Sequence, residues 1–61
     1  MTRTYTARIT AIVAALGGNK SEAVRRLRTT WPTLQRWTRG GSPQDRNTQA
    51  RIAEVEAELG L

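Results

Sequence analysis

The stretch from Asn19 to Gly41, NKSEAVRRLRTTWPTLQRWTRGG, gives the clearest structural information in this 61-residue chain. Its pattern predicts two short amphipathic helices that are joined by a tight turn. Asn19 and Glu22 have the spacing of a capping box, in which each residue satisfies a free backbone N–H of the other. The first helix of this pair therefore begins at Asn19. Its inward stripe consists of Ala23, Val24 and Leu27.

The first helix of the pair should end near Arg28, because two β-branched threonines follow it. Pro32 disfavours helical geometry at Trp31 and suits the first turn of the next helix, which Thr30 or Trp31 caps. That next helix closes at Gly40-Gly41. Its inward pair is Leu34 and Trp37.

With that pair in the core, the 3.6-residue period turns the remaining polar positions of the helix outward. Trp31 and Pro32 then lie at its exposed front end. The outward positions are Gln35, Arg36 and Arg39.

The segment before Asn19 predicts a further helix, because its apolar residues recur at the i, i+3, i+4 spacing of one face. Thr4 or Thr6 caps its start, and Gly17-Gly18 ends it. Its inward residues are Tyr5, Ile9, Ile12, Val13 and Leu16.

A last helix follows Gly41. Ser42 and Pro43 have the pattern of a cap and a first-turn proline, while Asp45 and Asn47 are equally good starts. The helix should run to about Leu59, and its shared face consists of Ile52, Val55 and Leu59. The sequence thus predicts one all-α domain over residues 1–61, a compact bundle of four helices.

The composition excludes several functions. The chain has no Cys and no His, which removes disulfides, thiolate or imidazole metal sites and the catalysis that these side chains support. The three glutamates of the last helix alternate, so neighbouring members are about 200° apart and do not converge on one metal or proton. We therefore expect neither an enzyme nor a bound cofactor or metal. No apolar run approaches the roughly 18–20 residues that span a bilayer, so a soluble protein without membrane contact is expected.

Charge is distributed unevenly along the chain. Residues 1–51 carry ten basic and two acidic side chains, a net charge of +8, whereas residues 52–61 carry three glutamates and no base, a net charge of −3. A basic body with an acidic tail favours a polyanionic partner for the body alone. The alternative is that the arginines serve only solubility.

From Gly17 to Gly41 the chain resembles the helix-turn-helix of the lambda-repressor-like family, which includes Cro and the Xre-type regulators. The matching segments are LGGNKSEAVRRL and TLQRWTRGGSP. Flanking helices of suitable length extend the resemblance over most of the chain. The buried hydrophobic positions of the motif are filled by Val24, Leu27, Leu34 and Trp37.

The resemblance implies a bundle that contains a helix-turn-helix and binds double-stranded DNA sequence-specifically, as a small Cro-like or phage-type transcriptional repressor. Its third helix, at about residues 31–39, would enter the major groove, where Arg pairs with guanine and Gln with adenine. A solvated helix face is the alternative for these positions, and for Trp31 also a place at the edge of the core. The predicted base-reading residues are Trp31, Gln35, Arg36 and Arg39.

Phosphate contacts are expected around the start of the second helix, where backbone N–H groups and the positive end of the helix dipole meet an ammonium group. Arg25 and Arg26 are further candidates for phosphate, with pairing to the acidic tail or plain hydration as equally compatible alternatives. Arg3 and Arg8 are candidates to follow the DNA backbone from the first helix. The predicted phosphate contacts are Asn19, Lys20, Ser21, Arg28, Thr30 and Thr33.

Two positions depart from the family pattern. The turn after Leu27 usually has Gly, and Arg28 occupies that place here. A Cβ in a left-handed conformation costs about 1 kcal/mol, or else the turn has another shape. Trp31 stands where small polar residues are common.

Readers of this kind commonly act as homodimers, in which the two reading helices lie about 34 Å apart. The outer part of the last helix is a candidate self-association surface, although a monomer, or a dimer that forms only on DNA, is equally compatible. Two other functions remain open: a helical module that binds an acidic protein, and a recombination or excision accessory protein that bends DNA. Size and resemblance suggest the cytoplasm of a bacterial cell or a phage-infected host.

Overall fold

The caps in the sequence determine where the first two helices begin. In the computed structural model, which describes residues 4–61, helix α1 (Tyr5–Ala15) is capped by the Thr4 hydroxyl, which accepts a hydrogen bond from the Ala7 N–H at 3.2 Å. Helix α2 (Lys20–Leu27) is capped by Asn19, whose Oδ1 accepts from the Glu22 N–H at 3.1 Å. Both starts were predicted. The Glu22 carboxylate departs from the reciprocal capping-box arrangement and pairs with arginines of its own helix.

Helix α3 (Trp31–Thr38) follows a three-residue connection and has Pro32 in its first turn, as predicted. Thr30 stands at the N-cap position without a side-chain bond to the backbone. Its hydroxyl lies 2.9 Å from that of Thr33, so the two threonines bond to each other across the first turn.

Of the starts that the sequence left open for the last helix, Asp45 is confirmed, and Ser42-Pro43 and Asn47 are not. Helix α4 (Arg46–Glu58) begins after Asp45, which was one of the alternatives, and Asn47 lies inside the helix. The Asp45 carboxylate accepts from the Asn47 N–H at 3.4 Å and from the Thr48 hydroxyl at 3.2 Å. Pro43 is buried in an extended connection, where its carbonyl accepts a hydrogen bond from Gln49 Nε2 at 3.0 Å. Pro43 is therefore not part of a helical first turn.

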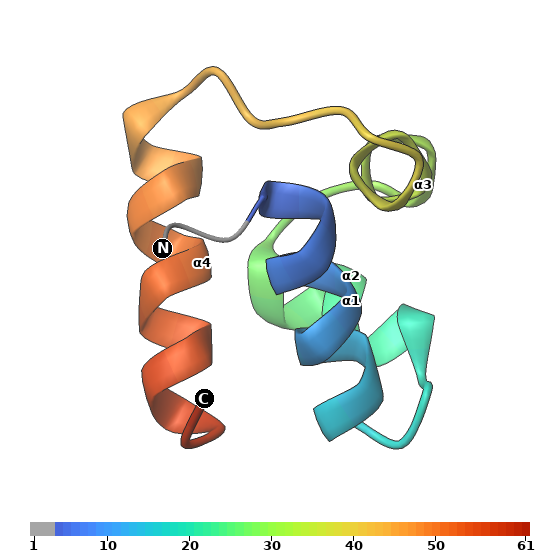
Figure 1. Cartoon of the computed structure of the whole chain (residues 1–61), viewed down its shortest axis with the longest axis vertical. Helices are drawn as coiled ribbons and strands as arrows, with labels where there is room; N and C mark the ends of the chain where they lie inside the picture. The colour runs from blue at the N-terminus through green and yellow to red at the C-terminus, as the bar shows by residue number, and fades with distance from the viewer. Residues whose placement is uncertain (1–3) are drawn as a thin grey trace.

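Each helix contributes two side chains to one core. The all-α class and the arrangement in four helices are confirmed for residues 4–61, which form a globule of 27 × 25 × 19 Å. Figure 1 shows α1 and α4 from the side and α3 almost end-on, so α3 runs across the directions of the other two. The buried apolar residues are Ile9, Ile12, Ala23, Leu27, Leu34, Trp37, Ile52 and Val55.

Side chains of α1 and α4 donate hydrogen bonds to carbonyls at the C-terminal ends of α3 and α2. The Thr6 hydroxyl donates to the Trp37 carbonyl at 2.7 Å, and Arg51 Nε donates to the Arg26 carbonyl at 2.7 Å. The last four carbonyls of a helix have no partner within it, so both bonds satisfy acceptors that would otherwise need water. Thus α1 holds the end of α3, and α4 holds the end of α2. No helix within residues 4–61 is long and apolar enough to cross a membrane.

Replacing Thr6 with Val should lower the free energy of unfolding by about 1 kcal/mol, because the Trp37 carbonyl loses its partner in a half-buried place. Thr10→Val in the same helix is the matched control, since the Thr10 hydroxyl is exposed and bonds only to the Thr6 carbonyl of α1 itself. Urea denaturation measures both. Equal effects for the two variants would contradict a specific role for the contact between α1 and α3.

Candidate nucleic-acid interface

Arg8 is committed to an ion pair inside the protein. Its Nε lies 3.0 Å from Glu56 Oε2, and the guanidinium forms further hydrogen bonds to Oε1 of the same carboxylate. Both side chains are largely covered, with exposed fractions of 22% and 15%. The hydrogen bond to Glu56 raises the pKa of Arg8, which also stacks over the Tyr5 ring at 4.8 Å. Arg8 is therefore turned toward α4 rather than outward as a DNA contact would require. Arg3 lies outside the described residues.

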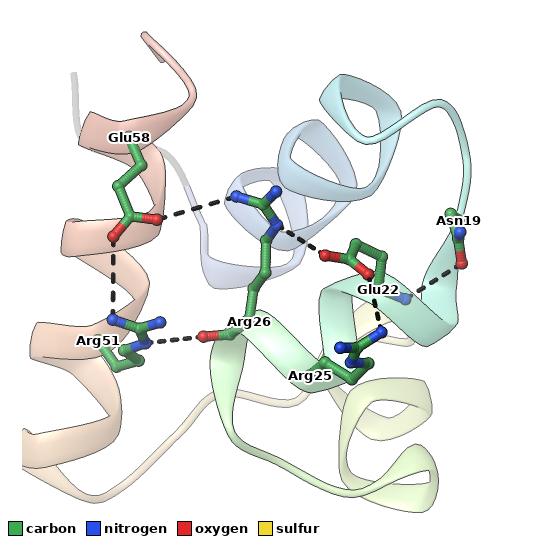
Figure 2. A network of polar contacts seen from close by, with 6 residues as sticks. All are labelled: Asn19, Glu22, Arg25, Arg26, Arg51 and Glu58. Atoms are coloured by element: carbon green, nitrogen blue, oxygen red, sulfur yellow. Dashed lines mark hydrogen bonds and ion pairs between the residues drawn. The ribbon is translucent and has the colours of Figure 1, made fainter.

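A second network joins α2 to α4 (Figure 2). Arg26 lies between two carboxylates, with Nε 3.1 Å from Glu22 Oε1 and Nη1 3.9 Å from Glu58 Oε2. Arg51 extends the network from α4, with Nη1 3.0 Å from Glu54 Oε2 and 4.0 Å from Glu58 Oε1. Of the outcomes predicted for Arg26, pairing with the acidic tail is confirmed.

Arg25 has a weaker tie to the same network. Its Nη1 lies 3.6 Å from Glu22 Oε2, and its side chain is 81% exposed. An ion pair this open to solvent contributes little to stability. Arg25 therefore remains largely hydrated, which was another predicted outcome.

The pairing leaves a group of cations without an acidic partner among residues 4–61. Four of them belong to α2, α3 and the residues that end these helices, and we call them the α2–α3 cations: Lys20, Arg28, Arg36 and Arg39. Arg46, at the start of α4, is the fifth such cation in the described part. The start of α2 and the whole of α3 lie on the side of the molecule away from α4 (Figure 1). Among residues 4–61, Glu54, Glu56 and Glu58 thus belong to α4 and Asp45 caps it, whereas Glu22 belongs to α2. The cations without an acidic partner there lie on α2 and α3, except for Arg46 at the start of α4.

Helix α3 has the predicted orientation. Leu34 and Trp37 are buried, and Trp37 is only 4% exposed. Trp31 is 46% exposed and lies outside the core cluster, so it does not cover the core edge as a buried residue would. Arg36 and Arg39 are also exposed, whereas Gln35 is half-buried.

The residues predicted to contact phosphate divide into separate places. Asn19, Lys20 and Ser21 are exposed together at the start of α2, although the Asn19 side chain is already used by its cap. Arg28 lies at the other end of that helix. It lines an open depression of about 370 Å³ on the side that faces α4, together with Leu27 and with Asn47, Thr48, Ala50, Arg51 and Glu54 of α4. Thr30 is exposed and Thr33 half-buried, at the front of α3.

Arg28 settles the question of the turn after Leu27. It has φ 54° and ψ 45°, a left-handed conformation that glycine adopts most easily. Its N–H bonds to the Arg25 carbonyl at 3.2 Å, and the Thr29 N–H bonds to the Val24 carbonyl at 3.1 Å. These two bonds form a Schellman closure of α2. The turn thus keeps the left-handed shape, and Arg28 carries the strain.

Two features escaped prediction from the sequence. Arg46 is an exposed cation at the start of α4, and only the position of the Asp45 cap identifies it as the first helical residue. The contact of Arg51 with the Arg26 carbonyl spans 25 positions and has no local signal. Among residues 4–61, no three His, Cys, Asp or Glu side chains are placed to hold a metal.

Arg28→Gly should raise the free energy of unfolding by about 0.5–1 kcal/mol, because it relieves the left-handed strain and gives back part of that gain through the greater freedom of unfolded glycine. Arg28→Ala removes the same charge and keeps the strained Cβ, so it serves as the control and should give no such gain. Urea denaturation of both variants decides the matter. Equal stabilities for the Gly and Ala variants would show that the backbone conformation is not the cause.

Comparison of the chain with known protein families, curated proteins and solved structures gives no match to any of them. Two properties of the structure bear on function. Helix α3 buries Leu34 and Trp37 and exposes Arg36 and Arg39, and these two arginines have no ion pair with the acidic side chains of α4 among residues 4–61.

Proposed function

We propose that the chain is a sequence-specific double-stranded DNA-binding protein, a small Cro-like or phage-type transcriptional repressor whose α3 enters the major groove. The observation that carries the proposal is the distribution of charge. Every carboxylate side chain within residues 4–61 has a partner in the protein: four bind arginines, and Asp45 caps α4. The α2–α3 cations have no such partner, so their charge is free to meet a polyanion.

The outward side of α3 has the chemistry that reads base edges. Arginine forms two hydrogen bonds with guanine, and glutamine does so with adenine. Arg36 and Arg39 are exposed on this side, and Gln35 is half-buried. Trp31, at the front of the helix, offers a large apolar surface for a thymine methyl group or a sugar.

The start of α2 is suited to anchoring a phosphate beside the groove. Lys20 brings an ammonium group to the first turn, and Ser21 brings a hydroxyl and a backbone N–H. The helix dipole adds partial positive charge at this end. In this arrangement α2, the connection and α3 together form the helix-turn-helix. The phosphate contacts of α2 fix the angle at which α3 enters the groove.

The acidic side chains of α4 orient the approach to DNA. Glu54, Glu56 and Glu58 pair with arginines of the protein, and the helix that carries them, α4, lies on the other side of the molecule from α3 (Figure 1). A polyanion is attracted more strongly to the side that carries Lys20, Arg36 and Arg39 than to the paired carboxylates of α4, which favours encounters with α3 leading. An eight-residue helix reads only a few base pairs, so two copies on a two-fold operator would supply the remaining specificity. Occupying an operator in this way blocks transcription.

DNA affinity should fall steeply with salt, because each phosphate contacted by a cation releases counterions. The two cations assigned to phosphate, Lys20 and Arg28, predict a slope of about −1.8 in log K against log salt, or about a 12-fold loss between 50 and 200 mM. Fluorescence anisotropy with a labelled duplex measures the slope. Lys20→Ala should make it shallower by about 1 and weaken binding to every sequence alike. A slope near zero, with affinity kept for an acidic protein, would favour a protein-interaction module.

Arg36→Ala should lose about 1–3 kcal/mol of binding on a duplex selected from a random pool and much less on a random duplex. Arg36→Lys is the matched control: it keeps the charge and loses the paired donors, so it should retain affinity for random DNA and lose the preference. Competition binding with both duplexes measures the affinity for random DNA and the preference for the selected duplex. Equal losses on the selected and random duplexes would remove Arg36 from base reading.

A further inference from the structure

Gly41 is a glycine because a Cβ would not fit there, whereas the other four glycines have a backbone conformation that favours glycine. Gly17, Gly18, Gly40 and Gly60 have positive φ, and a Cβ at any of them would meet nothing within 4 Å. Gly41 lies outside the positive-φ region. A Cβ there would lie 2.8 Å from Arg36 Cγ and 2.9 Å from the Arg36 carbonyl oxygen. Only a hydrogen fits between Gly41 and Arg36.

This closeness results from the way α3 ends. The Gly41 N–H bonds to the Arg36 carbonyl at 2.9 Å, and the Arg39 N–H bonds to the same carbonyl at 3.1 Å. The Thr38 hydroxyl satisfies the carbonyl one position earlier, that of Gln35, at 2.8 Å. The chain after α3 is therefore folded back against the base of the Arg36 side chain, and the stem of that side chain lies directly over Gly41.

We propose that Gly41 is a positioning residue for Arg36, setting the direction in which the arginine stem leaves α3. The proposal rests on the proposed function, in which Arg36 reads a base. An arginine side chain has several rotatable bonds. If rotation about the Cα–Cβ bond of Arg36 is already restricted in the free protein, binding costs less conformational entropy. Gly41 thus acts on base preference through Arg36 and needs no contact with DNA.

The contact is tested first in the free protein. Nuclear Overhauser effects between the Gly41 Hα and Arg36 Hγ protons should be strong in the wild type, because a Cβ at Gly41 would lie 2.8 Å from Cγ. In Gly41→Ala the Arg36 Hγ and Cγ resonances should shift, because the added Cβ displaces the stem and also presses on the Arg36 carbonyl. Absence of the Overhauser effect in the wild type would overturn the proposal, whether or not the protein binds DNA.

The consequence for recognition is tested by competition between the selected and random duplexes. Gly41→Ala should reduce the preference for the selected duplex by a factor similar to Arg36→Ala, about 5- to 150-fold. The double variant should lose no more preference than Arg36→Ala alone, since the two residues act through one side chain. Gly60→Ala is the control for general destabilisation, because its Cβ meets open space while its backbone is strained.

The outcomes separate this proposal from the proposed function. A wild-type protein that shows no preference among duplexes would contradict the proposed function, and the Overhauser effect would still decide whether Gly41 holds Arg36. A wild type with a preference that Arg36→Ala removes and Gly41→Ala preserves would overturn the positioning role alone. Losses that multiply in the double variant would overturn it as well.

Discussion

The burial of Trp37 is the constraint on which the rest of the structure depends. A chain of about 60 residues can bury only about 60% of the surface that it exposes when unfolded, so each helix must give its best apolar face to one small core. Trp37 is the largest side chain in that core, and its carbonyl is bound by Thr6 of α1. Once Trp37 and Leu34 are inside, the helical period leaves Arg36 and Arg39 outside. Core packing thus determines which side of α3 a partner can meet.

Much of this was predictable because the signals are local. The caps at Thr4 and Asn19, the proline in the first turn of α3 and the Leu34/Trp37 pair each act within one helical turn. The start of α4 was not resolved in advance, since Ser42-Pro43 and Asp45 carry equally good local patterns. Local patterns do not decide between them, and the burial of Pro43 is a tertiary effect.

The functions of the arginines were harder to predict than the helices. Arg8 and Arg36 look alike in the sequence, yet one is bound to a carboxylate 48 positions away and the other has no acidic partner in the described part of the chain. Only the packing of α4 against the bundle distinguishes them. A net charge of +5 therefore conceals a division between internal, neutralised arginines and external, uncompensated ones.

The hydrogen bonds from Thr6 and Arg51 have a consequence for modularity. The segment that carries α2 and α3 looks like a portable unit, but the ends of both helices rely on donors from outside it. Excised as a peptide, it would lose these donors together with most of its apolar cover, and helices of eight residues do not persist alone in water. The outward side of α3 thus exists only in the finished bundle. A substitution in α1 or α4 can therefore disturb the outward side of α3 without changing any residue of α3 itself.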